Sequence, residues 1–311
     1  MHPAFSLVFF TTATGAGYGL LALVGIFSVL GLASPLTGFC VASLGLAFAL
    51  IISGLLSSTG HLGRPERAWR AFSQWRTSWL SREGLASVIT FIPAGAFAIG
   101  WIYLGPGNIW VSIAGILAAV SAMITVYTTG MIYASLKPIA QWHSRFTAPG
   151  YIAFSLMTGS VLLNAMLHVF GAESLPPTIV ALATTLWGWA WKWRTWSHND
   201  TLGSAISLNS ATGLKEGTVR SIEWPHTEEN YLLKEMGFRI ARKHQARLRL
   251  ITQLLAFLVP VLLICGSVLL WQPLGIVFSI LAALSQFCGI LVERWLFFAE
   301  AKHNVAVYYG R

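Results

Sequence analysis

Charged residues are scarce in this sequence. Only 10% of the 311 residues are Asp, Glu, Lys or Arg, whereas about a quarter of the residues in an ordinary soluble domain are charged. The first charged side chain is Arg64, and the chain before it is long enough for two bilayer crossings of about 20 residues each. The shortage of charge excludes an ordinary soluble protein and predicts an integral membrane protein.

Cysteine is also rare, and its three occurrences do not form a cluster. Cys40, Cys265 and Cys288 lie far apart in apolar stretches, whereas iron–sulfur clusters and structural zinc need about four ligands with characteristic spacings. A membrane haem usually needs two histidines at similar depth, but the two that touch apolar segments, His61 and His168, fall at opposite predicted membrane faces. We therefore predict no metal site, no haem and no catalytic residue in this chain.

Charge is missing from the middle of the apolar segments as well. Among the acidic residues, Glu293 alone lies inside a predicted span, toward one end of it. Ion pumps and proton-coupled transporters keep ionisable groups along their transport path, so transmembrane proton pumping is disfavoured. A small-molecule transporter stays open as an alternative, although no pair of broken helices indicates its binding site.

Long apolar segments account for most of what is present. Eight of them are long enough to cross a bilayer, and they run over residues 5–32, 36–56, 85–104, 109–133, 151–170, 178–193, 250–271 and 274–297. Because irregular backbone cannot face lipid, these segments must be helices. The predicted fold class is an all-α integral membrane protein, an eight-transmembrane-helix bundle that forms a single membrane domain over residues 1–311.

The basic residues are distributed very unevenly. All 20 Lys and Arg residues lie at the end of the second, fourth and sixth spans, in the connections that follow them, or toward the C-terminus, and the connections on the opposite side have none. The positive-inside rule therefore places both termini and the three longer loops in the cytoplasm, as in a multi-pass protein of the bacterial inner membrane. This bias accounts for the net positive charge, and no nucleic-acid partner is predicted.

One sizeable polar insertion, residues 196–249, joins the sixth and seventh spans on the predicted cytoplasmic side. Its first half is rich in Gly, Ser, Thr and Asn and is predicted to be irregular. From about Thr227 an amphipathic helix is expected to merge into the seventh span, with Arg239, Arg242 and Lys243 on its basic face. An interfacial helix held by anionic membrane lipid and a docking surface for a soluble partner both stay open.

Residues His61 to Glu83 form the densest group of functional side chains and read HLGRPERAWRAFSQWRTSWLSRE, with five Arg and three Trp. A structural interpretation is available, because interfacial tryptophans and positive-inside arginines are common. In that interpretation Glu83 is a first-turn acid of the third helix, after Ser81 as its N-cap. A functional interpretation, a quinone pocket at the membrane interface, stays beside it.

The functional interpretation follows from what a quinone head group needs. An imidazole such as His61 can donate a hydrogen bond to a quinone carbonyl, and a carboxylate such as Glu83 can carry a proton to or from it. Arginines can balance negative charge on the ring, and tryptophan faces can stack on it. The predicted quinone-binding residues are His61, Glu83, Arg64, Arg82, Trp69 and Trp79.

The whole chain resembles the DmsC-type family, the membrane anchors of dimethyl-sulfoxide-reductase-like molybdoenzymes. The resemblance is carried by the eight-span layout, the runs HLGRPERAWRAF and SWLSRE, and the opening MHPAFSLVFFTTATGAGYG. It implies a haem-free anchor that binds ubiquinone or menaquinone and docks a four-cluster, ferredoxin-like iron–sulfur subunit, which in turn connects to a molybdopterin catalytic subunit. The family's quinone-site histidine and glutamate correspond to His61 and Glu83, whereas Arg64 is only a candidate ligand.

Sidedness distinguishes branches of that family. Periplasmic sulfoxide reductases present the anchor's quinone site to the periplasm, whereas the basic loops here are predicted to face the cytoplasm. This arrangement resembles the anchor of the cytoplasm-facing sulfite dehydrogenase (quinone) complex, in which sulfite is oxidised to sulfate and electrons reach quinone. The chain is then a subunit of a sulfite:quinone oxidoreductase that is not catalytic alone. Docking is expected at Arg67, Arg70, Arg76, Arg239, Arg242 and Lys243.

Two further alternatives stay open beside the transporter. One is an anchor that runs in the other direction, with quinol giving electrons to an S- or N-oxide. The other is a purely structural anchor whose quinone site lies in the partner subunit.

Overall fold

A computed structural model describes residues 4–60, 62–202, 207–214, 216–223, 239–302 and 304, with the backbone alone for 239–243. The long helices are α1 (Phe5–Val29), α2 (Thr37–Thr59), α3 (Trp79–Leu104), α4 (Ile109–Ala134), α5 (Thr147–Val169), α6 (Leu175–Thr201) and α11 (Gln272–Ala299). One more crossing runs from α9 (Arg239–Thr252) through the π-helical η2 (Gln253–Leu258) into α10 (Val259–Leu269). The described residues contain no strand, and the predicted all-α membrane fold is confirmed.

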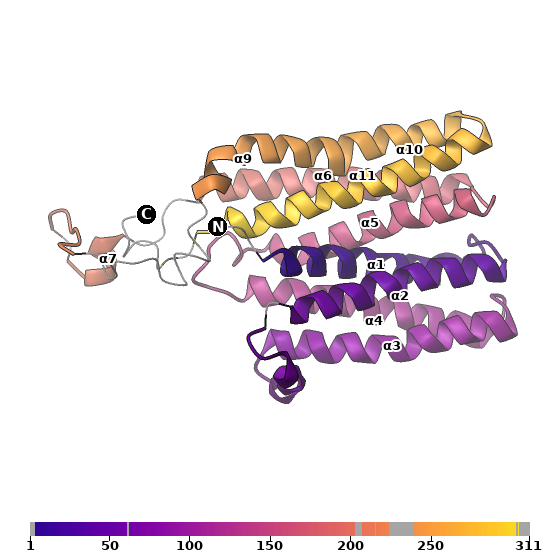
Figure 1. Cartoon of the computed structure of the whole chain (residues 1–311), viewed down its shortest axis with the longest axis horizontal. Coiled ribbons are helices and arrows are strands. Elements are labelled where there is room, and N and C mark those ends of the chain that lie inside the picture. Colours follow the sequence, from indigo (N-terminus) through magenta and orange to yellow (C-terminus); the bar gives the residue numbers. More distant parts are fainter. Residues whose placement is uncertain are drawn as a thin grey trace.

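Seven of these crossings are long and apolar enough, over the described residues, to span a membrane. The remaining one, α6, has the length, 27 residues, but it ends in a charged and tryptophan-rich sequence. The helices run alternately up and down, so their connections fall into two groups at opposite ends of the bundle (Figure 1).

The two ends differ in the length and charge of their connections. We call the charged end the one formed by the connections that follow α2, α4 and α6, with the start of α1 and the end of α11 (Figure 1). It includes the 3-10 helix η1 (Pro65–Gln74) and the short helix α7 (Leu208–Thr212). The described Lys and Arg residues lie in these connections or in the adjoining parts of the helices.

Helix α1 lies at the centre of the bundle, where it packs on α2, α4, α5 and α11. It is apolar on all sides and buried along most of its length, as expected for a helix surrounded by other helices. Small residues let α1 and α5 touch through their backbones: a Cβ at Gly159 would overlap the backbone of Gly19. In the same crossing, Ser155 donates a hydrogen bond of 2.7 Å to the carbonyl of Gly15.

Helix α3 begins earlier than the sequence predicts. Its first residue is Trp79 and its N-cap is Ser78, so the interpretation of Glu83 as a first-turn acid after Ser81 is wrong. The helix extends toward the charged end because Arg82 finds partners there, donating to the carbonyls of Trp75 and Arg76 at 2.9 and 2.7 Å. Glu83 is thereby placed inside the bundle.

Helix α6 ends later than predicted, at Thr201 instead of residue 193. Trp196 is therefore buried inside a helix and does not belong to the insertion, and Lys192 is buried in the same helix. The described insertion begins with a short helix, α7, whose N-cap is Ser207. The helix predicted from about Thr227 is seen from Arg239 onward, where it continues into the seventh crossing, and residues 224–238 lie outside the described part of the chain.

Candidate functional site

Glu83 is a carboxylic acid buried among helices near the charged end. Only 7% of the residue is exposed, and its Oε1 lies 3.4 Å from Oγ1 of Thr129 on α4. Thr129 also donates to the carbonyl of Thr125 at 3.0 Å, so its single hydrogen is shared. No described Lys or Arg side chain forms an ion pair with Glu83. A buried acid with so few partners is costly for the fold and, within a membrane, indicates a functional site.

Hydroxyl side chains from three helices surround Glu83. Ser87 lies one turn further along α3 and donates to the Glu83 carbonyl at 2.8 Å. Tyr18 of α1 and Tyr133 of α4 are within electrostatic range of the Glu83 carboxyl group. The buried hydroxyl of Tyr18 lies near the Ser87 side chain but makes no hydrogen bond of good geometry among the described atoms. Buried polar groups are normally satisfied by protein or by ordered water, so this hydroxyl is available to a ligand or to water.

The first turn of α3 adds a cationic and aromatic pair beside the buried acid. The guanidinium of Arg82 lies 4.3 Å above the ring of Trp79. Trp79 in turn makes an edge contact with Tyr127 of α4, with 6.2 Å between ring centroids. Tyr127 lines an apolar groove of about 460 Å³ between α1, α4 and α5. An apolar chain lying in this groove would end beside Trp79.

The other predicted loop residues lie on η1, which packs beside α3 with Phe72 against Gly84. Arg64 is exposed at the start of η1. Trp69 is 65% exposed and packs under the guanidinium of Arg70 at 5.7 Å. Arg67, Arg70 and Arg76 are exposed as well. Trp79, Arg82 and Glu83 thus lie in the first two turns of α3, with Arg82 on Trp79 and Glu83 buried, whereas Arg64 and Trp69 are exposed on the outer surface.

Several predicted residues fall outside the described part of the chain. His61 is one of them, so its approach to Glu83 stays a prediction. Arg239, Arg242 and Lys243 belong to the helical start of α9, but their side chains are not described. Their proposed contact with a partner also stays a prediction.

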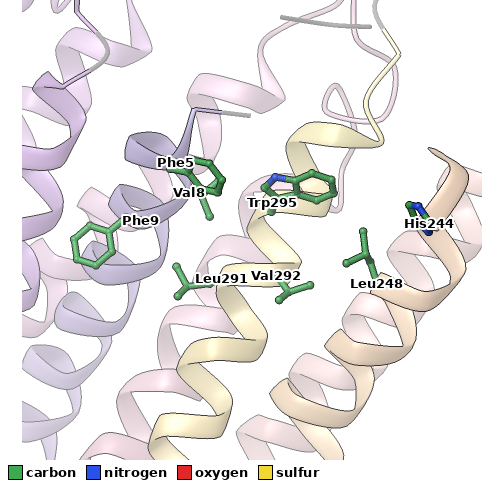
Figure 2. A pocket seen from close by; sticks show the side chains of 8 residues that line it. All are labelled: Phe5, Val8, Phe9, His244, Leu248, Leu291, Val292 and Trp295. Atoms are coloured by element: carbon green, nitrogen blue, oxygen red, sulfur yellow. The ribbon is translucent and has the colours of Figure 1, made fainter. Parts of the chain in front are cut away.

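A larger apolar groove opens on another face at the charged end (Figure 2). Its volume is about 670 Å³, and α1, α9 and α11 form its walls. The lining side chains are Phe5, Val8 and Phe9 of α1, His244 and Leu248 of α9, and Leu291, Val292 and Trp295 of α11 (Figure 2). The lining is almost wholly apolar, so this groove suits a hydrocarbon chain and offers little chemistry of its own.

A buried ion cluster was missed by sequence reasoning, which counted Lys192, at the end of the sixth predicted span, with the charges of the loop that follows. Lys192 and Arg294 are each 4% exposed and Glu293 is 0% exposed. Lys192 Nζ pairs with Glu293 Oε1, and Arg294 Nε pairs with Glu293 Oε2 at 2.5 Å. The sequence did indicate one member of the cluster, because Glu293 is an acid inside the last predicted span. Sequence alone could not show that Lys192 of α6 pairs with it, since that contact depends on how α6 packs against α11.

Metal binding finds no support among the described side chains, where no group of three or more His, Cys, Asp or Glu residues could hold an ion. The geometry instead combines a buried acid, the Tyr18 hydroxyl and the apolar groove at Tyr127. Such a site suits a ligand with hydrogen-bonding oxygens at one end and a hydrocarbon chain at the other.

Comparison with known proteins places the chain among membrane-anchor subunits. The family model of the DMSO reductase anchor subunit (DmsC) matches residues 1–300. The C subunit of sulfite dehydrogenase from Allochromatium vinosum is 33% identical over 99% of both proteins. The C component of the anaerobic dimethyl sulfoxide reductase from Escherichia coli is 29% identical over 43% of this chain and 48% of that protein. No solved structure matches the chain.

Proposed function

Because the chain belongs to the DMSO reductase anchor subunit (DmsC) family, we propose that it binds membrane quinone beside Glu83 and passes electrons to it from an iron–sulfur partner. Family membership makes the chain the membrane anchor of a DMSO-reductase-like complex. The molybdopterin and the iron–sulfur clusters then belong to partner subunits, and this chain supplies a quinone site without haem.

One observation carries the quinone proposal: Glu83 is a buried acid with a shared hydroxyl contact and no described cationic partner. A bound quinone takes up two electrons and two protons when it is reduced. Glu83 can hold a proton at its carboxyl oxygens and release it to a ligand oxygen. Tyr18 offers a hydroxyl, Trp79 offers an aromatic face, and the groove at Tyr127 excludes water from an isoprenoid chain.

The partner and the direction of electron flow follow from the relatives and from the charge distribution. We propose that the complex oxidises sulfite to sulfate on the cytoplasmic side of the inner membrane. A relative that matches the whole chain is named a sulfite dehydrogenase subunit, and the positive-inside rule favours a cytoplasmic charged end. The exposed arginines of the η1 segment, Arg67, Arg70 and Arg76, would dock the four-cluster iron–sulfur subunit.

A reductase that takes electrons from quinol is the second candidate. It is favoured by the two matching relatives that are named as parts of anaerobic dimethyl sulfoxide reductases, at 29% and 27% identity. Those matches cover only 43% and 38% of this chain, so we prefer the oxidative direction. The same site chemistry serves both directions, and only a turnover measurement separates them.

Sidedness can be tested with alkaline phosphatase fusions, because this enzyme needs disulfides that form only outside the cytoplasm. We expect a fusion after Gly105, at the uncharged end, to be active. A fusion after Gly213, which follows α7 at the charged end, should be inactive. Immunoblots for equal amounts of both fusions provide the control, and the reverse activity pattern would overturn the cytoplasmic assignment.

A further inference from the structure

Glu83 needs a source of protons if it serves quinone as proposed, because it is buried away from water. The route by which a proton reaches Glu83 therefore rests on that proposed function. Three buried charged residues, Lys192, Glu293 and Arg294, are the first evidence for this route, and we call them the buried ion cluster. Burying three charges is costly, so their retention inside the bundle calls for an explanation.

Tyr151 of α5 lies next to the ion cluster. The guanidinium of Arg294 is 4.4 Å from the centroid of the Tyr151 ring. The charges of both Arg294 and Glu293 act on Tyr151. The Tyr151 hydroxyl and the Arg294 guanidinium are buried and close enough to act on each other as hydrogen-bonding groups, although neither the hydroxyl nor Arg294 Nη1 makes a hydrogen bond of good geometry among the described atoms. Buried polar groups whose hydrogen bonds are incomplete commonly also bind ordered water, and water in this position can carry a proton.

Tyr133 connects this region to Glu83. Its ring stacks on the ring of Tyr151, with 5.8 Å between centroids and 14° between planes. Tyr133 is within electrostatic range of Glu83 on one side and of Arg294 on the other. On α4 it follows Thr129, the hydroxyl contact of Glu83, by one helical turn. Tyr133 therefore interacts with both Glu83 and Arg294, and Tyr151, which stacks on it, interacts with Arg294 and Glu293.

The ring of Trp196 lies beside the ion cluster and beside a second group of charges. Lys192 Nζ lies 4.8 Å from the ring of Trp196, and Arg249 lies 5.2 Å from the same ring. Arg249 pairs with Asp200 at 2.7 Å and with Glu300 at 2.8 Å. The Asp200 side chain is 55% exposed, so this second group of charges is in contact with the aqueous phase.

We propose that the buried ion cluster, Tyr151 and Tyr133 form the proton relay that connects water at the charged end with Glu83. Each quinone reduced consumes two protons and two electrons. The electrons come from the iron–sulfur partner, and both protons come from water at the charged end. Glu83 releases a proton to a ligand oxygen and is protonated again through the tyrosine hydroxyls, each of which gains one proton as it loses another.

The tyrosine hydroxyls provide the sharpest test, because Tyr151→Phe and Tyr133→Phe keep the rings and their packing. The complex is reduced with a stoichiometric amount of dithionite, and reoxidation of its iron–sulfur clusters by a soluble quinone analogue is followed by absorbance. We expect each variant to lower the maximal rate about tenfold or more and to increase the ratio of rates in H₂O and D₂O. The quinone concentration at half-maximal rate should stay within about twofold of the wild type.

Tyr103→Phe is the matched control, since Tyr103 is 81% exposed at the uncharged end and should behave as the wild type. A merely structural role would lower thermal stability without changing the isotope effect. If both relay variants keep the wild-type rate and isotope effect, the relay is wrong while the proposed function stands. If the wild-type complex itself fails to reduce the quinone analogue, the proposed function fails and the relay fails with it.

Discussion

Replacing Glu83 with Gln is expected to lower the maximal rate of quinone reduction about 100-fold, the usual order for loss of a proton-transferring group. The amide keeps the size of the carboxyl group and can still contact Thr129, but it cannot carry a proton. The quinone concentration at half-maximal rate should therefore change by less than about threefold, because binding is retained while the proton-transfer step is lost. Reoxidation of the dithionite-reduced complex by a soluble quinone analogue measures both quantities.

Glu66→Gln is the control for this substitution. Glu66 is an exposed acid on η1, so removal of its charge should leave the maximal rate unchanged. Glu83→Asp should keep part of the activity, because a carboxyl group remains on a shorter side chain. A Glu83→Gln complex that turns over at the wild-type rate would show that Glu83 carries no proton. It would favour a structural anchor whose quinone site lies in the partner.

Replacing Glu293 with Gln is expected to destabilise the protein by about 3–5 kcal/mol, the usual cost of breaking a buried ion pair. The substitution leaves the cations of Lys192 and Arg294 buried without a carboxylate. Thermal unfolding in detergent, followed by tryptophan fluorescence, should show a lower melting temperature and less protein recovered from membranes. Adding Lys192→Met should recover part of the loss, because it removes one of the two unpaired charges.

Glu300→Gln provides the same change of charge at a more accessible ion pair. Glu300 pairs with Arg249, and the two side chains are 12% and 18% exposed. Arg249 keeps its pairing with Asp200 when Glu300 is neutralised, so no cation is left without a carboxylate. The melting temperature of this variant should therefore stay close to that of the wild type. Equal melting temperatures for Glu293→Gln and Glu300→Gln would mean that water reaches the ion cluster and screens it.

The sequence predicts the membrane class and the separation of charge between the two ends, because hydrophobic length and Lys/Arg distribution are local properties. It also indicates Glu83, since an acid at the end of an arginine- and tryptophan-rich run is conspicuous. The loop residues Arg64 and Trp69 are adjacent to Glu83 only along the chain, and the 3-10 helix η1 turns them outward. Which residues of the His61–Glu83 stretch point into the helix bundle depends on the three-dimensional path of the loop, and sequence does not give that path.

The residues missed by sequence reasoning depend on contacts between distant helices. Tyr18 reaches the region of Glu83 because α1 is central, and Tyr151 is placed by the close α1–α5 crossing at Gly19 and Gly159. The length of α6 was underestimated because the polar residues after Trp193 look like a loop until Asp200 is placed beside Arg249 of α9. A helix can continue through charged residues when those residues pair with charges on a neighbouring helix, and local hydropathy does not reveal such pairs.

Sulfite-dependent reduction of a soluble quinone analogue tests most directly whether this anchor connects a sulfite-oxidising partner to quinone. The complex would be purified in gentle detergent through a tag on this chain. We predict activity, together with molybdenum and iron in the preparation. If molybdenum and iron are present but sulfite gives no activity, the anchor role stands and the proposal that the complex oxidises sulfite is wrong. A preparation that contains no metalloprotein would contradict the role of this chain in an electron-transfer complex.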